Sequence, residues 1–329
     1  MLNMSGDDVK FVQTKLKEFG LYNGKIDGFF GQNLLVSVTN FQRKVNIKAD
    51  GIIGMQTWSQ LLNYNPNPIV VEEKKPVVNP IKNDIPFTPS YIGEDGFMIY
   101  DCLLTDEEYN KVDVRKETIY LHHTGGGSRP DWTIRSWEKD YLKDKKGNPV
   151  LDKKGNLIPL KVGTQYVIGR KSSSTGDTLW DGKILRAFDD RYWAYHLGIK
   201  TKNDELNSKS IGIEICNYGP LKIGKDGKFY NYVNKPIMES EVVELEKPFR
   251  GYKYWERYTD KQIESTRKLI LYLQNRWGIE IEKGIYNEDW FNYDTKWFTN
   301  GGLRSHTQVR KDKFDIFPQK EMIQMLNSL

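Results

Sequence analysis

The sequence predicts two structural units: a small N-terminal three-helix bundle and a larger α/β domain with a central mixed sheet flanked by helices. Apolar residues recur at helical spacing in the first 65 residues, and short apolar runs alternate with helix-like segments in the last two thirds of the chain. Six of the 13 prolines fall between Pro66 and Pro89. We therefore expect a first unit at 1–65, an extended linker at 66–95 and a second unit at 96–329.

Three helices are expected in the first unit, joined by two similar turns. The segment "IDGFFGQ" at Ile26–Gln32 returns as "ADGIIGMQT" at Ala49–Thr57. Each Asp-Gly pair favours a tight turn, and the following glycine frees the chain to enter a helix. The helical spacing is carried by Val9, Val12, Leu16 and Phe19, then Leu34, Leu35, Val38 and Phe41, then Trp58, Leu61 and Leu62.

The second unit reads as strands followed by one long helix. The helix is expected over Thr259–Trp277, with Thr259 and Gln262 as a capping box and Gly278 as the stop signal. Segments 139–161 and 219–258 look like insertions, and a repeated Lys-Lys-Gly-Asn in the first predicts a hairpin with Gly-Asn turns. The expected strands are Thr118–His122, Gln165–Gly169, Ile184–Ala187 and Ile211–Cys216.

Composition excludes several classes of protein. Hydrophobic content of 38% and charged content of 28% are ordinary for a soluble chain. No run of about 18 apolar residues is present, so we expect no membrane span. Cys102 and Cys216 form no disulfide framework. The net charge is +5, but the basic residues are scattered and no nucleic-acid motif accompanies them, so we expect no nucleic-acid partner. We also expect a monomer.

The chain has four histidines, which are the candidates for chemistry. His122 and His123 are neighbours on an expected strand, so their side chains should point to opposite faces. Two histidines and a carboxylate can hold a catalytic zinc ion and leave one position open. No pair, however, has the spacing of a His-Glu-x-x-His helix or a zinc finger. From the residues alone, a metal site and purely structural histidines are equally open.

The first unit resembles the peptidoglycan-binding domain that begins many cell-wall hydrolases. The resemblance rests on "GLYNG", on the pair Phe41–Gln42 and on both Asp-Gly-x-x-Gly turns, and it covers Gly6 to Leu62. It implies bacterial peptidoglycan as the partner. The turn residues can serve as ligand contacts or only as turn chemistry, and the two readings are compatible.

The second unit resembles the type-2 N-acetylmuramoyl-L-alanine amidases, which include phage lysozyme-like amidases and are related to peptidoglycan recognition proteins. Six motifs occur in the family's order: "IYLHHTGGG", "VGTQYVIGR", "DGKILRAF", "AYHLG", "SIGIEI" and "SHTQVRKDKFDIFP". The resemblance implies Zn²⁺ as cofactor. It also implies hydrolysis of the amide between the lactyl group of N-acetylmuramic acid and L-alanine of the stem peptide.

Metal ligands are carried over from the family by position. The resemblance assigns His122 and His306 as two ligands and Asp315 as the third. This chain lacks the first proline and the glycine of the family's Lys-x-Asp-Pro-Gly-Pro, so Asp312 competes with Asp315 for the third position. We prefer Asp315.

Catalytic and substrate-binding residues follow from the same resemblance. Glu214 is the expected general base, and Lys313 is expected to stabilise the oxyanion formed when water attacks the amide. Thr164 stands where some family members carry a catalytic tyrosine. Since threonine cannot act as a comparable base, we expect Glu214 to be the general base. We place Thr164 and His196 among the substrate-binding residues, and we do not assign His196 to the metal.

Two alternative functions remain beside the amidase. One is a non-catalytic wall-binding protein, against which the retained ligand residues argue. The other is a virion-associated component that opens the wall during entry. The N-terminal residues show no secretory signal, so we expect a phage endolysin made in the host cytoplasm that acts on the cell wall after release.

Overall fold

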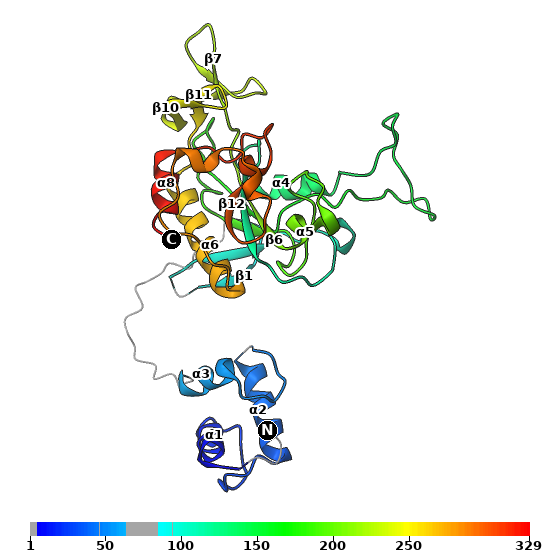
Figure 1. Cartoon of the computed structure of the whole chain (residues 1–329), viewed down its shortest axis with the longest axis vertical. Helices are drawn as coiled ribbons and strands as arrows, with labels where there is room; N and C mark the ends of the chain where they lie inside the picture. Colours follow the sequence, from blue (N-terminus) through cyan, green and yellow to red (C-terminus); the bar gives the residue numbers. More distant parts are fainter. Residues whose placement is uncertain (1–4, 46, 64–84, 94) are drawn as a thin grey trace. The chain divides into compact units, whose positions relative to one another are not determined.

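The computed structural model describes residues 5–45, 47–63, 85–93 and 95–329, and the chain divides into two compact units, Met1–Ile81 and Lys82–Leu329 (Figure 1). Residues 66–84 of the predicted linker lie outside the described residues. Its last part does not: Ile85 is 4% exposed within a hydrophobic core, and strand β1 (Pro89–Ile92) joins the main sheet. The linker therefore ends before residue 85 and not at 95. Among the described helices, none is long and apolar enough to cross a membrane.

The first unit contains the three expected helices, α1 (Asp7–Glu18), α2 (Gln32–Lys44) and α3 (Met55–Asn63). Their apolar stripes meet in one core, in which Leu16, Val38, Phe41 and Leu61 are at most 1% exposed. The sequence periodicity thus marks the buried faces correctly.

The internal repeat of this unit is a pair of turns, each held by a buried glutamine. Gln13 Oε1 accepts the backbone N–H of Gly28 at 2.8 Å, and Gln13 Nε2 donates to Asp27 Oδ1 at 2.8 Å. Gln42 makes the same two contacts with Asp50–Gly51, at 3.2 and 2.8 Å. Both glutamines are at most 1% exposed. The repeated Asp-Gly pairs therefore have a structural reason, because the side-chain amides satisfy the polar groups that each turn buries.

The second unit is built on a seven-stranded mixed sheet of order β1-β2-β5-β4-β6-β3-β12. Strands β2/β5, β4/β6, β3/β6 and β3/β12 pair in parallel, and β1/β2 and β4/β5 pair antiparallel. This confirms the predicted fold class. The further bounds are β2 (Met98–Asp101), β3 (Thr118–His123), β4 (Tyr166–Ile168), β5 (Ile184–Arg186), β6 (Ser210–Ile215) and β12 (Gly302–Ser305).

Helices flank this sheet, and the longest is the expected one, α6 (Asp260–Trp277). Its capping box is present, since Thr259 Oγ1 accepts from Gln262 N–H and Gln262 Oε1 accepts from Thr259 N–H, both at 3.1 Å. Such a cap stabilises a helix by about 1 kcal/mol. The remaining helices are α4 (Pro130–Trp137), α5 (Glu205–Ser208), α7 (His306–Val309) and α8 (Lys320–Leu326), with 3-10 turns η1 (Asp106–Glu108), η2 (Lys202–Asp204), η3 (Glu239–Glu241), η4 (Glu288–Phe291) and η5 (Thr295–Trp297).

The two faces of the central strands have different roles. Odd-numbered residues of β3 and β6, such as Leu121 and Ile213, pack with Leu269 and Leu273 of α6 in the largest core. Even-numbered residues point to the other face, where Tyr120 packs against a smaller cluster. His122 and Glu214 are even-numbered neighbours in the β3–β6 register, so the strand geometry puts both on the second face.

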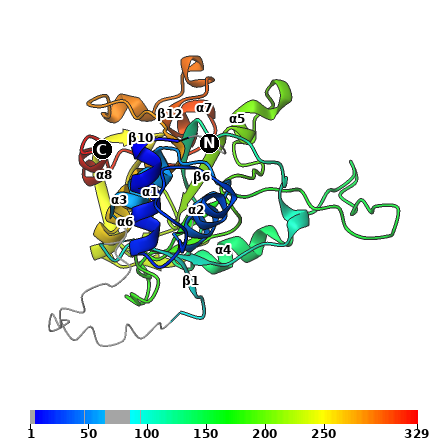
Figure 2. The same cartoon turned by 90° about the horizontal axis from the view of Figure 1, so that it is seen from below.

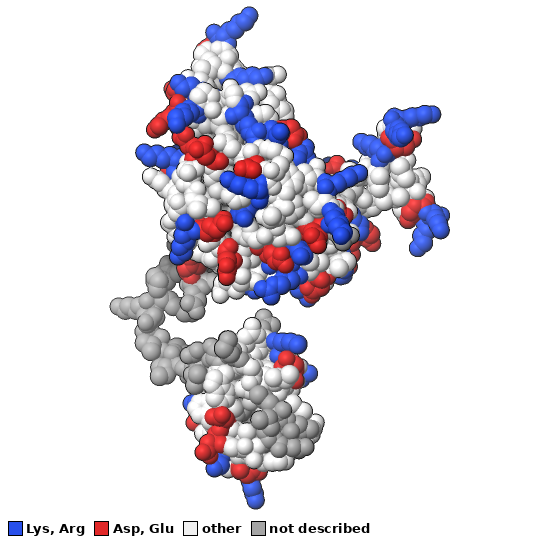
Figure 3. Space-filling view, viewed as in Figure 1, with Lys and Arg blue, Asp and Glu red and all other residues white. Residues whose placement is uncertain are grey.

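The first predicted insertion forms an arm that projects from the body in both views (Figures 1 and 2). It contains two successive tight turns, in which the carboxylates of Asp144 and Asp152 each accept backbone N–H groups two and four residues ahead. The predicted Gly-Asn turns are therefore confirmed. Figure 3 shows basic and acidic side chains together on this arm, as over the rest of the face shown.

The second predicted insertion, 219–258, has small sheets of its own. It contains β7 (Lys222–Ile223), β8 (Phe229–Tyr230) and β9 (Pro236–Ile237), followed by the hairpin of β10 (Val242–Phe249) and β11 (Tyr252–Glu256). Arg170, which follows β4, anchors it through ion pairs with Glu241, at 2.9 Å, and Glu256. All three side chains are almost fully buried, so losing one partner would leave a buried charge unpaired.

Candidate active site

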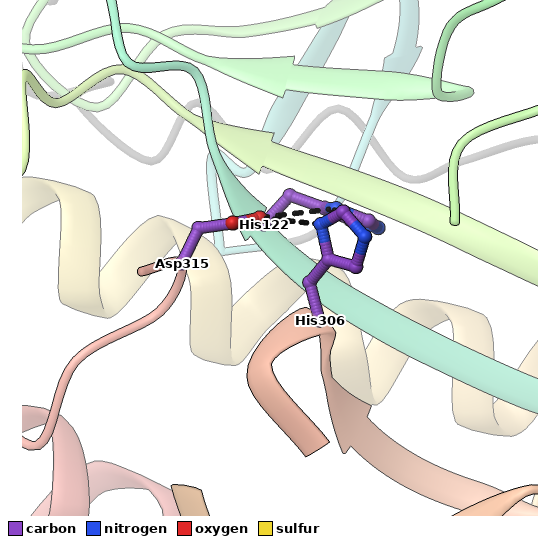
Figure 4. A group of neighbouring side chains, drawn as sticks. All are labelled: His122, His306 and Asp315. Carbon is purple, nitrogen blue, oxygen red and sulfur yellow. Dashed lines mark hydrogen bonds and ion pairs between the residues drawn. The ribbon is translucent and has the colours of Figure 1, made fainter. Parts of the chain in front are cut away.

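Two neighbouring parallel strands bring the histidines of the site together. β3 and β12 run side by side, with Ser305 opposite Leu121. His122 is the next residue of β3, and His306 is the next residue after β12 and the first of α7. Their side chains therefore meet at the carboxyl edge of the sheet, and the loop between α7 and α8 adds Asp315 (Figure 4).

Three ligand atoms converge at this point. His122 Nδ1 lies 3.0 Å from His306 Nδ1 and 3.3 Å from Asp315 Oδ2, and His306 Nδ1 lies 2.8 Å from the same oxygen. The three residues are 1%, 3% and 7% exposed, respectively. Among the described residues they form the group of His, Cys and acidic side chains suited to hold a metal ion, with their ligand atoms within 4.8 Å of one another.

A backbone carbonyl sets the tautomer of His306. His306 Nε2 lies 2.9 Å from the carbonyl oxygen of Leu197, which can only accept a hydrogen bond. Nε2 must therefore carry the hydrogen, and Nδ1 keeps a lone pair that faces His122 and Asp315.

A longer chain of hydrogen bonds sets the tautomer of His122. The Ser210 hydroxyl donates to Leu206 O at 2.5 Å, so its oxygen is an acceptor for His196 Nε2 at 2.8 Å. His196 Nδ1 then accepts from His122 Nε2 at 3.0 Å. This leaves a lone pair on His122 Nδ1, directed at the same point as that of His306.

The electrostatics of the site favour a cation. Burial and the neighbouring His306 lower the pKa of His122 to about 4, so its imidazole is neutral. Asp315 is buried beside them and points its carboxylate at the same place. Two lone pairs and a carboxylate facing one point repel one another unless a positive charge lies between them.

The ligand spacing also fits a small metal ion. A tetrahedral zinc ion with bonds of about 2.0–2.1 Å separates its ligand atoms by about 3.3 Å. The distances here, 2.8 to 3.3 Å, require only a slight widening. Two imidazoles and one carboxylate are a donor set that catalytic zinc sites use. The residues present therefore fit the group that the sequence resemblance implies.

Glu214 lies beside the ligands on the same face of the sheet. It is the register partner of His122 on the adjacent strand β6. Its Oε2 atom is buried without a hydrogen-bond partner. Burial, together with the charge of Asp315, raises the pKa of Glu214 to about 8, and Lys313 acts against this shift. The metal-free carboxyl group therefore holds a proton at neutral pH, whereas a cation bound beside it would favour the ionised form, whose free oxygen can accept a proton.

The two aspartates that the sequence left open have opposite surroundings. Asp312 is 64% exposed in its side chain and is paired with Arg310, whose guanidinium donates to both carboxylate oxygens at 2.7 and 2.6 Å. Asp315 is buried between the two histidines. Lys313, between them in sequence, is half-buried, and its charge acts on Glu214 and His122.

The two residues expected to bind substrate make hydrogen bonds within the protein. Both ring nitrogens of His196 are engaged, by His122 and Ser210, so His196 supports the ligand His122 and has no free nitrogen to offer a substrate. Thr164 is 1% exposed, and its hydroxyl donates to Tyr166 O at 3.1 Å, so it packs within the protein. The ring nitrogens and the hydroxyl thus have partners inside the protein, and the substrate-binding roles of His196 and Thr164 stay predictions.

Sequence reasoning overlooked Ser210 and Gly212. An added Cβ at Gly212 would lie 2.4 Å from Thr164 Cγ2 and 3.2 Å from His196 Nδ1, so only glycine leaves room for this packing. The available signal was the alternation Ser210, Gly212, Glu214 in "SIGIEI", which puts three unusual strand residues on one face.

His123 lies on the opposite face from the ligands, as predicted. It is 9% exposed and packs beside Trp255 and Phe317, and its Nδ1 lies 3.1 Å from the Tyr258 hydroxyl. It belongs to the protein core on the α6 side and not to the metal group.

The fold and the site define a class: an α/β domain with a group of three residues, suited to hold a metal ion, at the carboxyl edge of its parallel strands. Comparison with known families is more specific. Residues 112–313, more than half of the chain, match the N-acetylmuramoyl-L-alanine amidase family, and residues 5–61 match a peptidoglycan binding domain. The chain belongs to the N-acetylmuramoyl-L-alanine amidase family and carries a peptidoglycan-binding domain at its N-terminal side.

The curated relatives match short stretches of the chain. A spore cortex-lytic enzyme of Bacillus cereus is 41% identical over 58 residues, 18% of this chain and 22% of that protein. The N-acetylmuramoyl-L-alanine amidase CwlM of Mycobacterium tuberculosis is 39% identical over 56 residues, 17% and 14% of the two chains. The chain thus spans about a fifth or less of the length of these curated relatives.

A solved structure is similar over more of the chain. It is the complex of the N-acetylmuramyl-L-alanine amidase AmiD from E. coli with the substrate anhydro-N-acetylmuramic acid-L-Ala-D-gamma-Glu-L-Lys. It is 17% identical, covers 71% of this chain and 65% of that one, and has a TM-score of 0.32.

Proposed function

We propose that this chain is a zinc-dependent peptidoglycan hydrolase that cleaves the amide between N-acetylmuramic acid and L-alanine. The observation that carries the proposal is the convergence of His122 Nδ1, His306 Nδ1 and Asp315 Oδ2, beside the unpartnered Oε2 of Glu214. Membership of the amidase family and the peptidoglycan-binding domain support the substrate.

His122, His306 and Asp315 would hold the zinc ion. When bound, zinc supplies a Lewis acid that polarises a carbonyl and lowers the pKa of water to about 7. His196, fixed by Ser210, holds His122 in the tautomer that offers Nδ1. Asp315 supplies the negative charge that balances the cation.

The protein's own groups then move the proton and stabilise charge. Glu214 takes the proton from the attacking water and returns it to the amine of L-alanine as the amide bond breaks. Lys313 carries its positive charge close to Glu214 and can stabilise the oxyanion that develops on the carbonyl oxygen. Thr164 has a packing role in this scheme, because its side chain is buried.

The biological setting remains a prediction from the sequence resemblance. It comprises the phage endolysin role, release from a host cytoplasm, and a monomeric state. A non-catalytic wall-binding protein is disfavoured, since three ligand residues and a candidate base lie together in one site.

The experiment is a digestion of purified peptidoglycan by the whole chain, with and without a chelator. The expected products are new L-alanine amino termini without new reducing sugars, and the chelator should abolish their release. New reducing ends would instead indicate a glycosidase, and intact peptidoglycan would indicate a binding protein.

A further inference from the structure

An inserted turn reaches the loop that follows the ligand strand. Tyr232 stands at the turn between β8 and β9, which Asn231 stabilises by accepting the N–H groups of Val233 and Lys235 at 3.2 and 2.9 Å. The Tyr232 hydroxyl donates to Gly125 O at 2.7 Å, yet its side chain is 61% exposed. Its polar atom is therefore engaged, while its ring is presented to the outside.

The loop that Tyr232 contacts is continuous with the site. Gly125 is three residues past His122, which is at most about 10 Å of chain. The loop is held against the end of β6, since Thr124 N–H donates to Ile215 O at 3.1 Å and Gly126 N–H donates to Asn217 O at 3.2 Å. Tyr232 is thus fixed to the end of the strands that carry the ligand and the candidate base.

A second tyrosine completes a wall at this place. Tyr218 follows β6, four residues after Glu214, and its ring centre lies 6.2 Å from that of Tyr232 in an edge-to-face arrangement. An added Cβ at Gly127 would lie 3.1 Å from the Tyr218 hydroxyl, so the glycine-rich loop lets this ring lie close. The two rings and the loop backbone thus lie together beyond the end of β6.

We propose that Tyr218 and Tyr232 form a sugar-binding wall that extends the amidase site along the glycan strand. This inference rests on the proposed function. A saccharide next to the cleaved muramoyl residue is the expected occupant, because the apolar face of an uncharged sugar ring suits an aromatic face whose hydroxyl is already bonded. The stem peptide carries carboxylates, which are better matched by cations than by these rings.

The test compares two substrates of the whole zinc-loaded protein. One is a soluble single-sugar N-acetylmuramoyl peptide, and the other is a glycan strand of several disaccharides with the same peptide. Tyr232→Ala should raise KM for the glycan strand about three- to tenfold and leave its kcat unchanged. The KM and kcat for the single-sugar substrate should not change. Tyr232→Phe keeps the ring and should stay close to the unaltered protein.

Val233→Ala is the matched control, since Val233 is the next residue of the same turn and is 47% exposed. It should change neither KM. An equal change in KM for both substrates in Tyr232→Ala, or no change in either, would contradict the sugar-binding wall and leave the proposed amidase function standing. If the unaltered protein hydrolysed neither substrate, the proposed function would fail and the wall with it. Unchanged thermal unfolding of the variants shows that the turn still folds.

Discussion

Asp315 and Asp312 are three residues apart on one loop, and only one of them faces the histidines. Asp315 is buried with its Oδ2 within 3.3 Å of both Nδ1 atoms, whereas Asp312 is bound to Arg310 at the surface. Removing the charge of Asp315 should therefore weaken metal binding, and removing that of Asp312 should not.

We expect Asp315→Asn to lower zinc affinity at least about 10- to 100-fold, and Asp312→Asn to change it less than about twofold. Competition with a chromophoric chelator measures both. The same loss in the two variants would mean that the ligand is wrongly assigned.

His196 should act through His122 and not through the substrate. We expect His196→Ala to lower zinc affinity about 10- to 100-fold, because His122 loses the acceptor that fixes its tautomer. Ser210→Ala should produce a smaller loss in the same direction. At saturating zinc, KM should be unchanged. A raised KM with unchanged zinc affinity would restore the substrate-binding role, and Tyr195→Phe, at an exposed neighbour, serves as control.

Glu214 should make the metal-free protein less stable as pH rises. Its pKa is raised from 4.5 to about 8 in the folded state, so the folded protein binds more protons than the unfolded one between these values. Stability is therefore lost as pH rises through this window. Glu214→Gln should remove the loss and stabilise the metal-free protein by about 1–3 kcal/mol at pH 8, with little difference at pH 4.

Denaturant unfolding of the metal-free protein at several pH values measures this difference. The same variant should lose about 10²- to 10⁴-fold in kcat once zinc is added, because the general base is gone. An activity within a few-fold of the unaltered protein would exclude Glu214 as the base.

At the residue scale, the sequence was informative where a motif was complete and silent on hydrogen bonds that only the tertiary fold creates. His122 and His306 stand at family positions, and the structure brings them together. The partners of His196 come from β3 and β6, far apart in sequence, so no local pattern showed that both ring nitrogens are occupied.

At the scale of elements, buried strands and capped helices could be predicted from the sequence, whereas a short strand with polar residues could not. β3 and β6 are buried on both faces and read as apolar runs, and α6 carries its capping box in the sequence. β12, with the sequence "GLRS", is only four residues long and includes a charged residue. It nevertheless positions His306, because it pairs with β3. That pairing joins segments far apart in sequence, so no local pattern predicts it.

The repeated turns of the first unit provide a prediction at this scale. Gln42→Ala should remove both contacts with Asp50–Gly51 and leave the turn's polar groups without partners, at a cost of about 1–3 kcal/mol. Amide hydrogen exchange in α2 and α3 of the whole chain should accelerate accordingly.

Gln13→Ala should act in the same way on the turn at Asp27–Gly28. Exposed Gln56→Ala, in α3, is the control and should leave exchange unchanged. Unaltered protection in both turn variants would show that the glutamines do not hold the turns.

At the scale of the whole molecule, each unit has its own hydrophobic core, which explains why composition and periodicity were enough to predict two units. The linker boundary was less accurate, because Pro86 and Pro89 read as linker although β1 begins at Pro89. An edge strand tolerates proline at its first residue, so the composition of this segment resembled that of the linker before it.

The central claim is that the three converging side chains hold one zinc ion on which hydrolysis depends. The most direct test is to titrate metal-free whole protein with zinc while measuring the release of L-alanine amino termini from purified peptidoglycan. We predict negligible release without metal, a rise that levels off at one zinc per chain, and no rise in His306→Ala. Full release by the metal-free protein, or an unchanged titration in His306→Ala, would contradict the account.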